Sequence, residues 1–251
     1  MEQSLTFEDK TLTITVPKEV PVGQKHPLIY VLDGNAFGPL LTNAILLQAR
    51  NSPKTGVWPA IIVSIGYQTD DSFQREGRFR DYTPRRVHPV RQDKRHHMPL
   101  GGGIEAFQAQ LVRIHALMMQ QYQIDEAQVG LFGHSLGGLC VLESYLVSPQ
   151  LPFITDFLAI SPSLWWDDCA FFDRLTQTDL ATSKRIFIAV ENDQGEMESA
   201  AMRCYQTLLQ IIPTEQVAFY VGPDENHMSI VFTALSRILR WFFDKGAIPY
   251  V

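Results

Sequence analysis

The stretch VGLFGHSLGGLCVL, residues 129–142, decides the fold. Its first four residues form an apolar run typical of a buried strand, and the apolar residues after Gly138 are typical of a helix. Between them lies G-H-S-L-G, residues 133–137, a turn so tight that a β-carbon at either flanking position would clash with the neighbouring strand or helix. Ser135 is therefore predicted to project its hydroxyl from the carboxyl end of the strand, as a nucleophilic serine does.

Short apolar runs alternate with longer helical patterns along the rest of the chain. Alternation of this kind predicts an α/β fold, with a mostly parallel central sheet and helices on both faces. We expect a single domain over residues 1–251, without a separate large cap domain, and a frayed tail over residues 244–251. The predicted strands are Leu12–Val16, Leu28–Leu32, Ile61–Ile65, Gln128–Phe132, Phe157–Ile160, Ile186–Val190 and Val217–Val221, and the predicted helices are Ile104–Tyr122, Ser135–Val147, Ser199–Ile212 and Ser229–Phe243.

The composition is that of an ordinary globular protein, 45% hydrophobic and 19% charged. The formal charge of −6 argues against general affinity for nucleic acid. The sequence contains no run of about 20 apolar residues, the length needed to span a bilayer, and its polar start has no signal-peptide core. We therefore expect no membrane partner and a cytoplasmic location. The three cysteines have no metal-ligand spacing. The sequence predicts neither a metal site nor a cofactor.

Residues 67–103 break the alternation, because they are polar, rich in arginine and without convincing periodicity. We expect a long loop here, and such loops are usually functional or disordered. Residues 75–97 contain eight Arg or Lys and three acidic residues, a local net charge of +5 in a chain of net −6. This asymmetry indicates either an anionic ligand or a solvated surface loop, and charge alone does not separate the two.

A serine nucleophile needs a base, usually a histidine oriented by a carboxylate. His227 is the only histidine that follows Ser135, and it lies between the last predicted strand and the final predicted helix. The carboxylate is expected in the loop after the predicted strand Ile186–Val190. Side-chain chemistry leaves several candidates open there, although we expect the first of them to lie too close to the strand to reach the histidine: Glu191, Asp193, Glu196 and Glu198.

Hydrolysis through such a serine also needs two backbone N–H groups that stabilise negative charge on the substrate oxygen. One is expected to be the amide of Leu136, the residue after the nucleophile. The other is expected from the turn after an early strand, where Gly34 allows close approach and Asn35 supplies the amide. A plain turn is the alternative interpretation of this segment.

Four local motifs together resemble the esterase family that includes the enterobactin and bacillibactin esterases, S-formylglutathione hydrolases and mycobacterial mycolyl-transferases. They are YVLDGN at 30–35, RDYTP at 80–84, GHSLGG at 133–138 and SPSLWW at 161–166, the last being the most discriminating. The resemblance covers roughly residues 12–243. It implies an α/β-hydrolase fold and a serine esterase that works through an acyl-enzyme without a cofactor.

The resemblance also implies an acid and a substrate class. The spacing of G-E-M-E, residues 195–198, before Met202 matches the family and selects Glu198, with Glu196 as the alternative. The expected substrate is the trilactone or ester backbone of a catecholate siderophore, and the expectation includes its ferric form. The groups expected around it are Arg78, Arg85, Arg86, Arg91, Lys94 and Arg95, with Trp165 and Trp166 as apolar walls. The alternatives are a carboxylesterase for short acyl, feruloyl or thioester substrates, and a non-catalytic ligand-binding relative.

Overall fold

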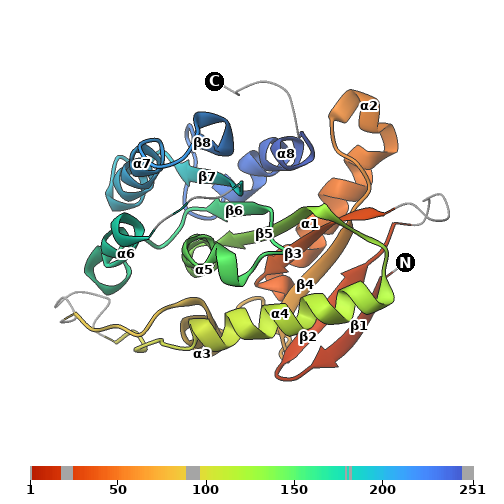
Figure 1. The fold of residues 1–251 in the computed structure, drawn as a ribbon, viewed down its shortest axis with the longest axis horizontal. Coiled ribbons are helices and arrows are strands. Elements are labelled where there is room, and N and C mark those ends of the chain that lie inside the picture. The colour runs from red at the N-terminus through yellow and green to blue at the C-terminus, as the bar shows by residue number, and fades with distance from the viewer. Residues whose placement is uncertain (1, 18–24, 89–96, 179, 181–182, 245–251) are drawn as a thin grey trace.

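A central sheet of eight strands carries the helices on its two faces (Figure 1). The computed structural model describes residues 2–17, 25–88, 97–178, 180 and 183–244. The strands are β1 (Glu2–Phe7), β2 (Lys10–Thr15), β3 (His26–Leu32), β4 (Ile61–Tyr67), β5 (Ile124–His134), β6 (Asp156–Ile160), β7 (Arg185–Glu191) and β8 (Val217–Gly222). The helices are α1 (Gly34–Gln48), α2 (Ser52–Thr55), α3 (Arg75–Tyr82), α4 (Ile104–Gln121), α5 (Leu136–Leu146), α6 (Phe171–Gln177), α7 (Glu196–Leu208) and α8 (Ile230–Phe243).

The strand order across the sheet is β1-β2-β4-β3-β5-β6-β7-β8. The hairpin β1–β2 and the pair β2–β4 are antiparallel, whereas every later pair is parallel. The strands β5 to β8 are therefore successive neighbours whose carboxyl ends lie along one edge. In open parallel sheets this edge is where ligands bind.

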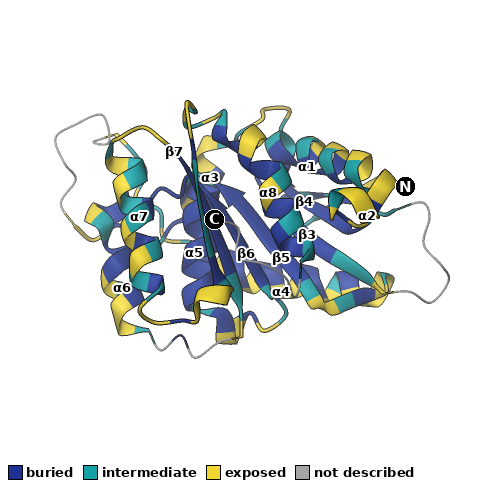
Figure 2. Cartoon of the chain, turned by 90° about the horizontal axis from the view of Figure 1, so that it is seen from above, coloured by how far each residue is buried: buried dark blue, intermediate teal, exposed yellow. Residues whose placement is uncertain are grey.

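Two apolar layers cover the sheet, one on each face. Helices α4, α5 and α7 bury apolar side chains in the larger layer, and α1 and α8 do so in the smaller one. In Figure 2 the central strands β3 to β7 are mostly buried, while the helices turn exposed residues outward. Strands covered on both faces need continuous apolar runs, and this is why β3 to β7 are recognisable in the sequence.

All seven predicted strands are present, and the predicted helices correspond to α4, α5, α7 and α8. The prediction of a mostly parallel sheet with helices on both faces is confirmed. Strand β1 was not predicted, because as an edge strand it is largely exposed and polar. The expectation of one long loop over residues 67–103 is wrong in part, because α3 lies within it and buries Phe79, Asp81 and Tyr82. Most of the predicted tail, residues 245–251, lies outside the described residues.

Glycines at three places allow the chain to make its closest approaches. A β-carbon at Gly133 would lie 2.3 Å from the carbonyl oxygen of Gly137, and one at Gly138 would lie 2.7 Å from that of Ile160. A β-carbon at Gly34 would lie 2.7 Å from the backbone of β4. These distances are shorter than real β-carbon contacts, so the turn around Ser135 and the start of α1 both require glycine.

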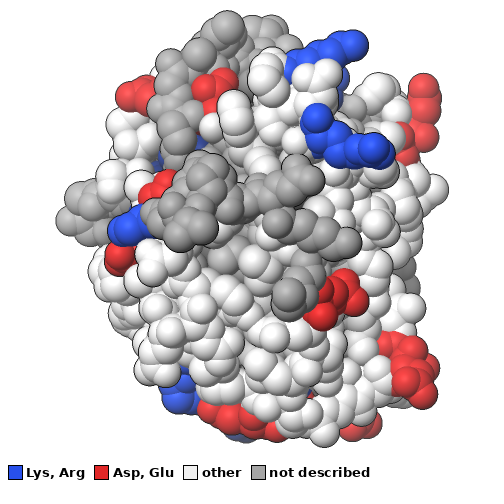
Figure 3. All heavy atoms as spheres, turned by 90° about the vertical axis from the view of Figure 1, so that its right-hand side faces the viewer, with Lys and Arg blue, Asp and Glu red and all other residues white. Residues whose placement is uncertain are grey.

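The charged side chains on the face drawn in Figure 3 are of both signs. They lie mainly around the margin of this face. No helix in the described part of the chain is both long and apolar enough to cross a membrane. Within the same ranges no group of three or more His, Cys, Asp or Glu residues is arranged to hold a metal ion.

Candidate active site

The predicted nucleophile lies where β5 ends and α5 begins. Ser135 has φ 59° and ψ −117°, the backbone conformation that the sharp turn imposes. Its amide donates to the carbonyl of Ile160 at 3.0 Å, and its carbonyl accepts from the amide of Ser163 at 3.1 Å. The residue is partly exposed, whereas its neighbours on both sides are buried. The turn therefore presents the Ser135 hydroxyl at the surface of an otherwise closed edge.

His227 lies within reach of this hydroxyl. Its Nε2 is 3.0 Å from Ser135 Oγ, so the imidazole can accept the hydroxyl proton. The loop between β8 and α8 is held in shape by Asn226, whose Oδ1 accepts from the amides of Met228 and Ser229 at 2.9 and 3.0 Å. The sequence prediction that His227 would meet Ser135 is consistent with this geometry.

The carboxylate beside His227 belongs to Glu191, not to Glu198. Glu191 Oε1 lies 3.0 Å from His227 Nδ1, and its Oε2 accepts from the hydroxyl of Ser161. Glu198 instead accepts from the amide of Gln194 at 2.9 Å, within the turn that starts α7. The choice of Glu198 is therefore corrected by the structure.

The sequence predicted Glu191 to lie too close to its strand to reach the histidine. It is the last residue of β7 and pairs with Gly222 at the end of β8. Strand β8 lies next to β7 in the sheet, and His227 lies in the loop that follows β8. This loop therefore brings the histidine to the end of β7, so the acid can be the last residue of the strand rather than a residue of the loop after it. The alternative acid Glu196 is an exposed residue in the first turn of α7.

Burial and hydrogen bonding act in opposite directions on this carboxylate. Only 2% of Glu191 is exposed, and burial alone would raise its pKa. The hydrogen bonds with His227 and Ser161 outweigh burial and hold the pKa of Glu191 below its ordinary value. Glu191 is therefore ionised at neutral pH and can stabilise a positive charge on the imidazole.

His134 supports the same histidine from the other side. Its Nε2 lies 2.7 Å from the carbonyl oxygen of His227, and the two rings have centroids 4.6 Å apart. Because that carbonyl can only accept, the proton of neutral His134 lies on Nε2. Burial, with a smaller contribution from His227, lowers the pKa of His134 to about 3. His134 is thus a neutral donor that fixes the backbone of His227.

Two helix N-termini converge beside Ser135. Strands β3 and β5 are parallel neighbours, with Val31 opposite Phe132, so α1 and α5 begin at the same edge of the sheet. A β-carbon at Gly137 would lie 3.3 Å from Asp33 Oδ2, which places the β3–α1 turn against the start of α5. The first amides of a helix have no intrahelical acceptor. The amides of Asn35 and Leu136, predicted to form the oxyanion hole, belong to these two first turns.

The side chain of Asn35 has a separate task. Its Oδ1 accepts from the amide of Tyr67 at 2.8 Å, and its Nδ2 donates to the carbonyls of Tyr67 and Thr69 at 3.1 and 2.8 Å. Gly66 leaves the space that this contact needs. The side chain thereby ties the start of α1 to the end of β4, and only its backbone amide is available to a substrate.

The residues predicted to contact the substrate differ in how far they are exposed. Trp166, predicted as an apolar wall, is buried, donates from Nε1 to the carbonyl of Pro84 at 3.0 Å and packs on Phe79, so its ring is turned into the protein. Arg86 is also buried, with its guanidinium over the Trp166 ring. Arg85 is exposed and Trp165 is partly exposed. Arg91, Lys94 and Arg95 lie outside the described residues.

Arg78 is drawn inward by an ion pair. Its Nε donates to Asp33 Oδ1 at 2.7 Å, and 15% of its side chain is exposed. Its guanidinium also lies over the ring of Phe73. The prediction of Arg78 as a substrate contact did not anticipate this partner, because nothing in the sequence pairs position 78 with position 33.

Sequence reasoning also missed two buried serines of the SPSLWW motif. Ser161 holds Glu191, and Ser163 Oγ lies 3.3 Å from Ser135 Oγ. Both follow β6, which separates β5 from β7 in the sheet. The motif itself was the available signal, since two serines flanking a proline directly after a buried strand lie at the edge where Ser135 lies.

The chain is similar to proteins of a known family. Residues 4–210 match the family described as putative esterase. The chain belongs to this esterase family. The ferri-bacillibactin esterase BesA of Bacillus subtilis (strain 168) is 32% identical over 245 residues, which cover 91% of this chain and 82% of the relative. The apo-salmochelin esterase of Escherichia coli O6:H1 (strain CFT073) is 34% identical over 171 residues, 65% of this chain and 50% of that protein.

A solved structure of the family has the same fold. The BES protein from Bacillus cereus superposes with a TM-score of 0.82 at 29% identity, covering 96% of this chain and 95% of that one. Together these matches identify the fold as that of the α/β hydrolases and the protein as a serine-type ester hydrolase. For the apo-salmochelin esterase the match spans about half of the relative's length.

Proposed function

We propose that this esterase hydrolyses the ester backbone of a catecholate siderophore through an acyl-enzyme formed on Ser135. The observation that carries the chemistry is the continuous line of contacts from Glu191 through His227 to Ser135, with both steps at 3.0 Å. The substrate class is supported by the relatives, which are named as esterases of bacillibactin and salmochelin.

Acylation begins when Ser135 Oγ attacks the ester carbonyl carbon and its proton passes to His227 Nε2. The carbonyl oxygen becomes an oxyanion, which accepts hydrogen bonds from the amides of Asn35 and Leu136. Glu191 stabilises the imidazolium through Nδ1 and holds the ring in its orientation. The intermediate then collapses, the C–O bond to the alcohol breaks, and His227 returns its proton to the departing oxygen.

Deacylation repeats the sequence with water as the nucleophile. His227 removes a proton from a water molecule, which attacks the acyl carbon, and the second oxyanion occupies the same two amides. Collapse releases the carboxylic acid and restores the hydroxyl of Ser135. Every proton in this proposed cycle moves through His227.

Two of the predicted substrate groups have the chemistry to bind such a substrate. Ferric tris-catecholates carry several negative charges, and catechol rings stack on aromatic and arginine side chains. Arg85 is exposed and Trp165 is partly exposed, so these two remain the proposed substrate contacts among the described residues. We propose no metal or cofactor for the chemistry itself.

The test is a hydrolysis panel with the wild-type protein and Ser135→Ala. Ferric and apo trilactone siderophores, a p-nitrophenyl ester and S-formylglutathione are compared by chromatography of the products. The proposal expects the trilactones to have the highest kcat/KM, and Ser135→Ala to abolish turnover while the fold is kept. Efficient turnover of simple esters with undetectable trilactone hydrolysis would show a general carboxylesterase instead. Failure of the folded protein to react with a fluorophosphonate probe would indicate a non-catalytic relative.

A further inference from the structure

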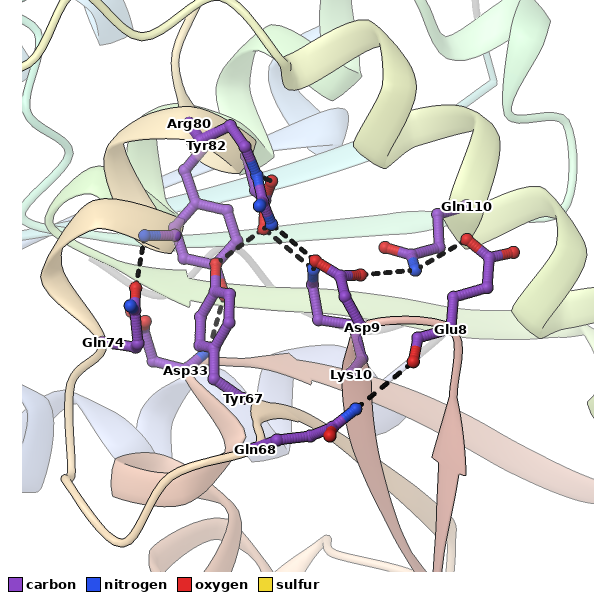
Figure 4. A network of polar contacts seen from close by, with 12 residues as sticks. Glu8, Asp9, Lys10, Asp33, Tyr67, Gln68, Gln74, Arg80, Tyr82 and Gln110 are labelled. Atoms are coloured by element: carbon purple, nitrogen blue, oxygen red, sulfur yellow. Dashed lines mark hydrogen bonds and ion pairs between the residues drawn. The ribbon is translucent and has the colours of Figure 1, made fainter.

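Helix α3 reaches across the sheet edge to the turn that precedes the Asn35 amide. Tyr82 Oη accepts from the amide of Asp33 at 3.0 Å, and Arg78 Nε donates to Asp33 Oδ1 at 2.7 Å. Figure 4 shows the first contact within the polar network that joins α3 to β4 and the β1–β2 turn. Both ends of Asp33, its backbone and its carboxylate, are therefore held by the same helix.

Asp33 combines a strained backbone conformation with a buried carboxylate. It has φ 51° and ψ 49°, the left-handed region, and only 1% of it is exposed. Within the described residues, no donor reaches its Oδ2. The same oxygen faces the start of α5, 3.3 Å from the β-carbon position of Gly137. A buried carboxylate therefore lies beside the two helix starts where negative charge must develop on the substrate.

An uncompensated carboxylate there would oppose the oxyanion, because two negative charges repel strongly where water is excluded. Arg78 is the cation in contact with Asp33. Among the residues that the structure describes, Tyr67, Tyr82 and Cys140 also interact with this carboxylate, and none of the three is cationic. Burial raises the pKa of Asp33, and the ion pair with Arg78 opposes that rise, so Arg78 favours the ionised carboxylate, offsets its charge and fixes its side chain.

We propose that Arg78 is a positioning residue that acts through Asp33: it neutralises the buried carboxylate and holds the β3–α1 turn so that the Asn35 amide can stabilise the oxyanion. This inference rests on the proposed acyl-enzyme chemistry and deepens it. It replaces the expectation that Arg78 binds the substrate directly. A group that acts on the oxyanion changes kcat, whereas a group that binds the substrate equally in ground and transition states changes KM.

The experiment measures kcat and KM for neutral p-nitrophenyl butyrate, which carries no charge for an arginine to bind. Arg78→Met should lower kcat by about 100-fold, the scale of losing one oxyanion donor, with KM within about threefold of wild type. The double variant D33N/R78M should recover kcat to within about tenfold of wild type, because asparagine removes the uncompensated charge and tolerates the left-handed conformation. Arg75→Met, on an exposed position one turn earlier in α3, is the matched control and should leave both constants unchanged.

Three results would overturn the inference. These are a rise in KM at unchanged kcat in Arg78→Met, a folded double variant no more active than Arg78→Met, and an effect of Arg75→Met equal to that of Arg78→Met. If Arg78→Met does not fold, Arg78→Lys and the double variant carry the test, and the expectation is that both are active. Turnover by the wild-type protein and its loss in Ser135→Ala report separately on the proposed chemistry, so the two failures are distinguishable.

Discussion

Replacing Glu191 with glutamine removes the carboxylate that faces the His227 imidazole and leaves the shape of the site almost unchanged. The expected result is a large loss of kcat, because His227 must carry a positive charge after it accepts the Ser135 proton. Glu198→Gln is the matched control, since the Glu198 carboxylate accepts from the amide of Gln194, in the turn before α7, rather than facing His227. It should retain nearly all of the wild-type kcat.

The magnitude follows from the contact. Glu191 Oε1 and His227 Nδ1 are 3.0 Å apart, and two unit charges about 4 Å apart contribute about 4 kcal/mol at an effective dielectric constant of about 20. Because 40% of the His227 side chain is exposed, we take half of this, about 2 kcal/mol, which corresponds to about a 30-fold loss of rate. A glutamine amide that turns its NH₂ toward Nδ1 also favours the wrong tautomer, which extends the expected loss toward about 10³-fold.

The assay is steady-state hydrolysis of a p-nitrophenyl ester at saturating concentration, at a pH where the wild-type kcat is constant. Unfolding in urea checks that both variants are folded. If Glu191→Gln keeps more than a third of the wild-type kcat, or if Glu198→Gln falls equally far, the assignment of the orienting carboxylate to Glu191 is wrong.

Three further predictions concern stability. Burial lowers the pKa of His134 to about 3 from about 6.5, so the stability contributed by neutral His134 is present above pH 6.5 and is lost as the pH falls toward 3. Between pH 6.5 and 4.5 the free energy of unfolding of the wild type, measured in urea, should fall by about 2–3 kcal/mol more than that of His134→Gln. Equal losses in the two proteins would contradict this. Gly138→Ala should lower the unfolding free energy by about 1–3 kcal/mol, because its β-carbon would strike the Ile160 carbonyl, and an unchanged Tm would refute it. Lys10→Met should lower the free energy of unfolding by about 3 kcal/mol, because Lys10 is buried and pairs with Asp81 at 2.9 Å. Chemical denaturation measures this loss, and a variant as stable as wild type would show that the pair contributes nothing.

The sequence was most informative where burial alone decides the structure. Strands β3 to β7 are covered on both faces and so appear as unbroken apolar runs. Helix α1 was missed because Gly34, Gly38 and Pro39 weaken the helical pattern, although the glycines serve close contact with β4. A residue chosen for a distant backbone contact gives no local signal, and this is the general reason for such omissions.

The site shows the same division. Ser135 and His227 are recognisable because a motif and a unique position mark them, and the structure brings them together at 3.0 Å. Glu191 was passed over because its partner arrives from β8, a neighbour in the sheet that the sequence order does not reveal. Helix α3 was not predicted because its buried face mixes two aromatic side chains with a charged one, which breaks the apolar periodicity. Asp81, for example, is satisfied by Lys10 and Tyr67, whose positions are known only after folding.

The backbone of Ser135 has a consequence for the choice of an inactive variant. A non-glycine residue at φ 59° and ψ −117° stores about 1–3 kcal/mol of strain, so catalysis is performed at a position that weakens the folded state. Alanine retains that strain, whereas glycine releases it and gives back only about 0.5–1 kcal/mol through the greater freedom of the unfolded chain. Two equally inactive proteins should therefore differ in Tm. Ser135→Gly measures the stability that the strained backbone at the nucleophile costs the enzyme. Ser135→Ala keeps the strain of the wild type, so it is the better inactive variant for binding and structural work.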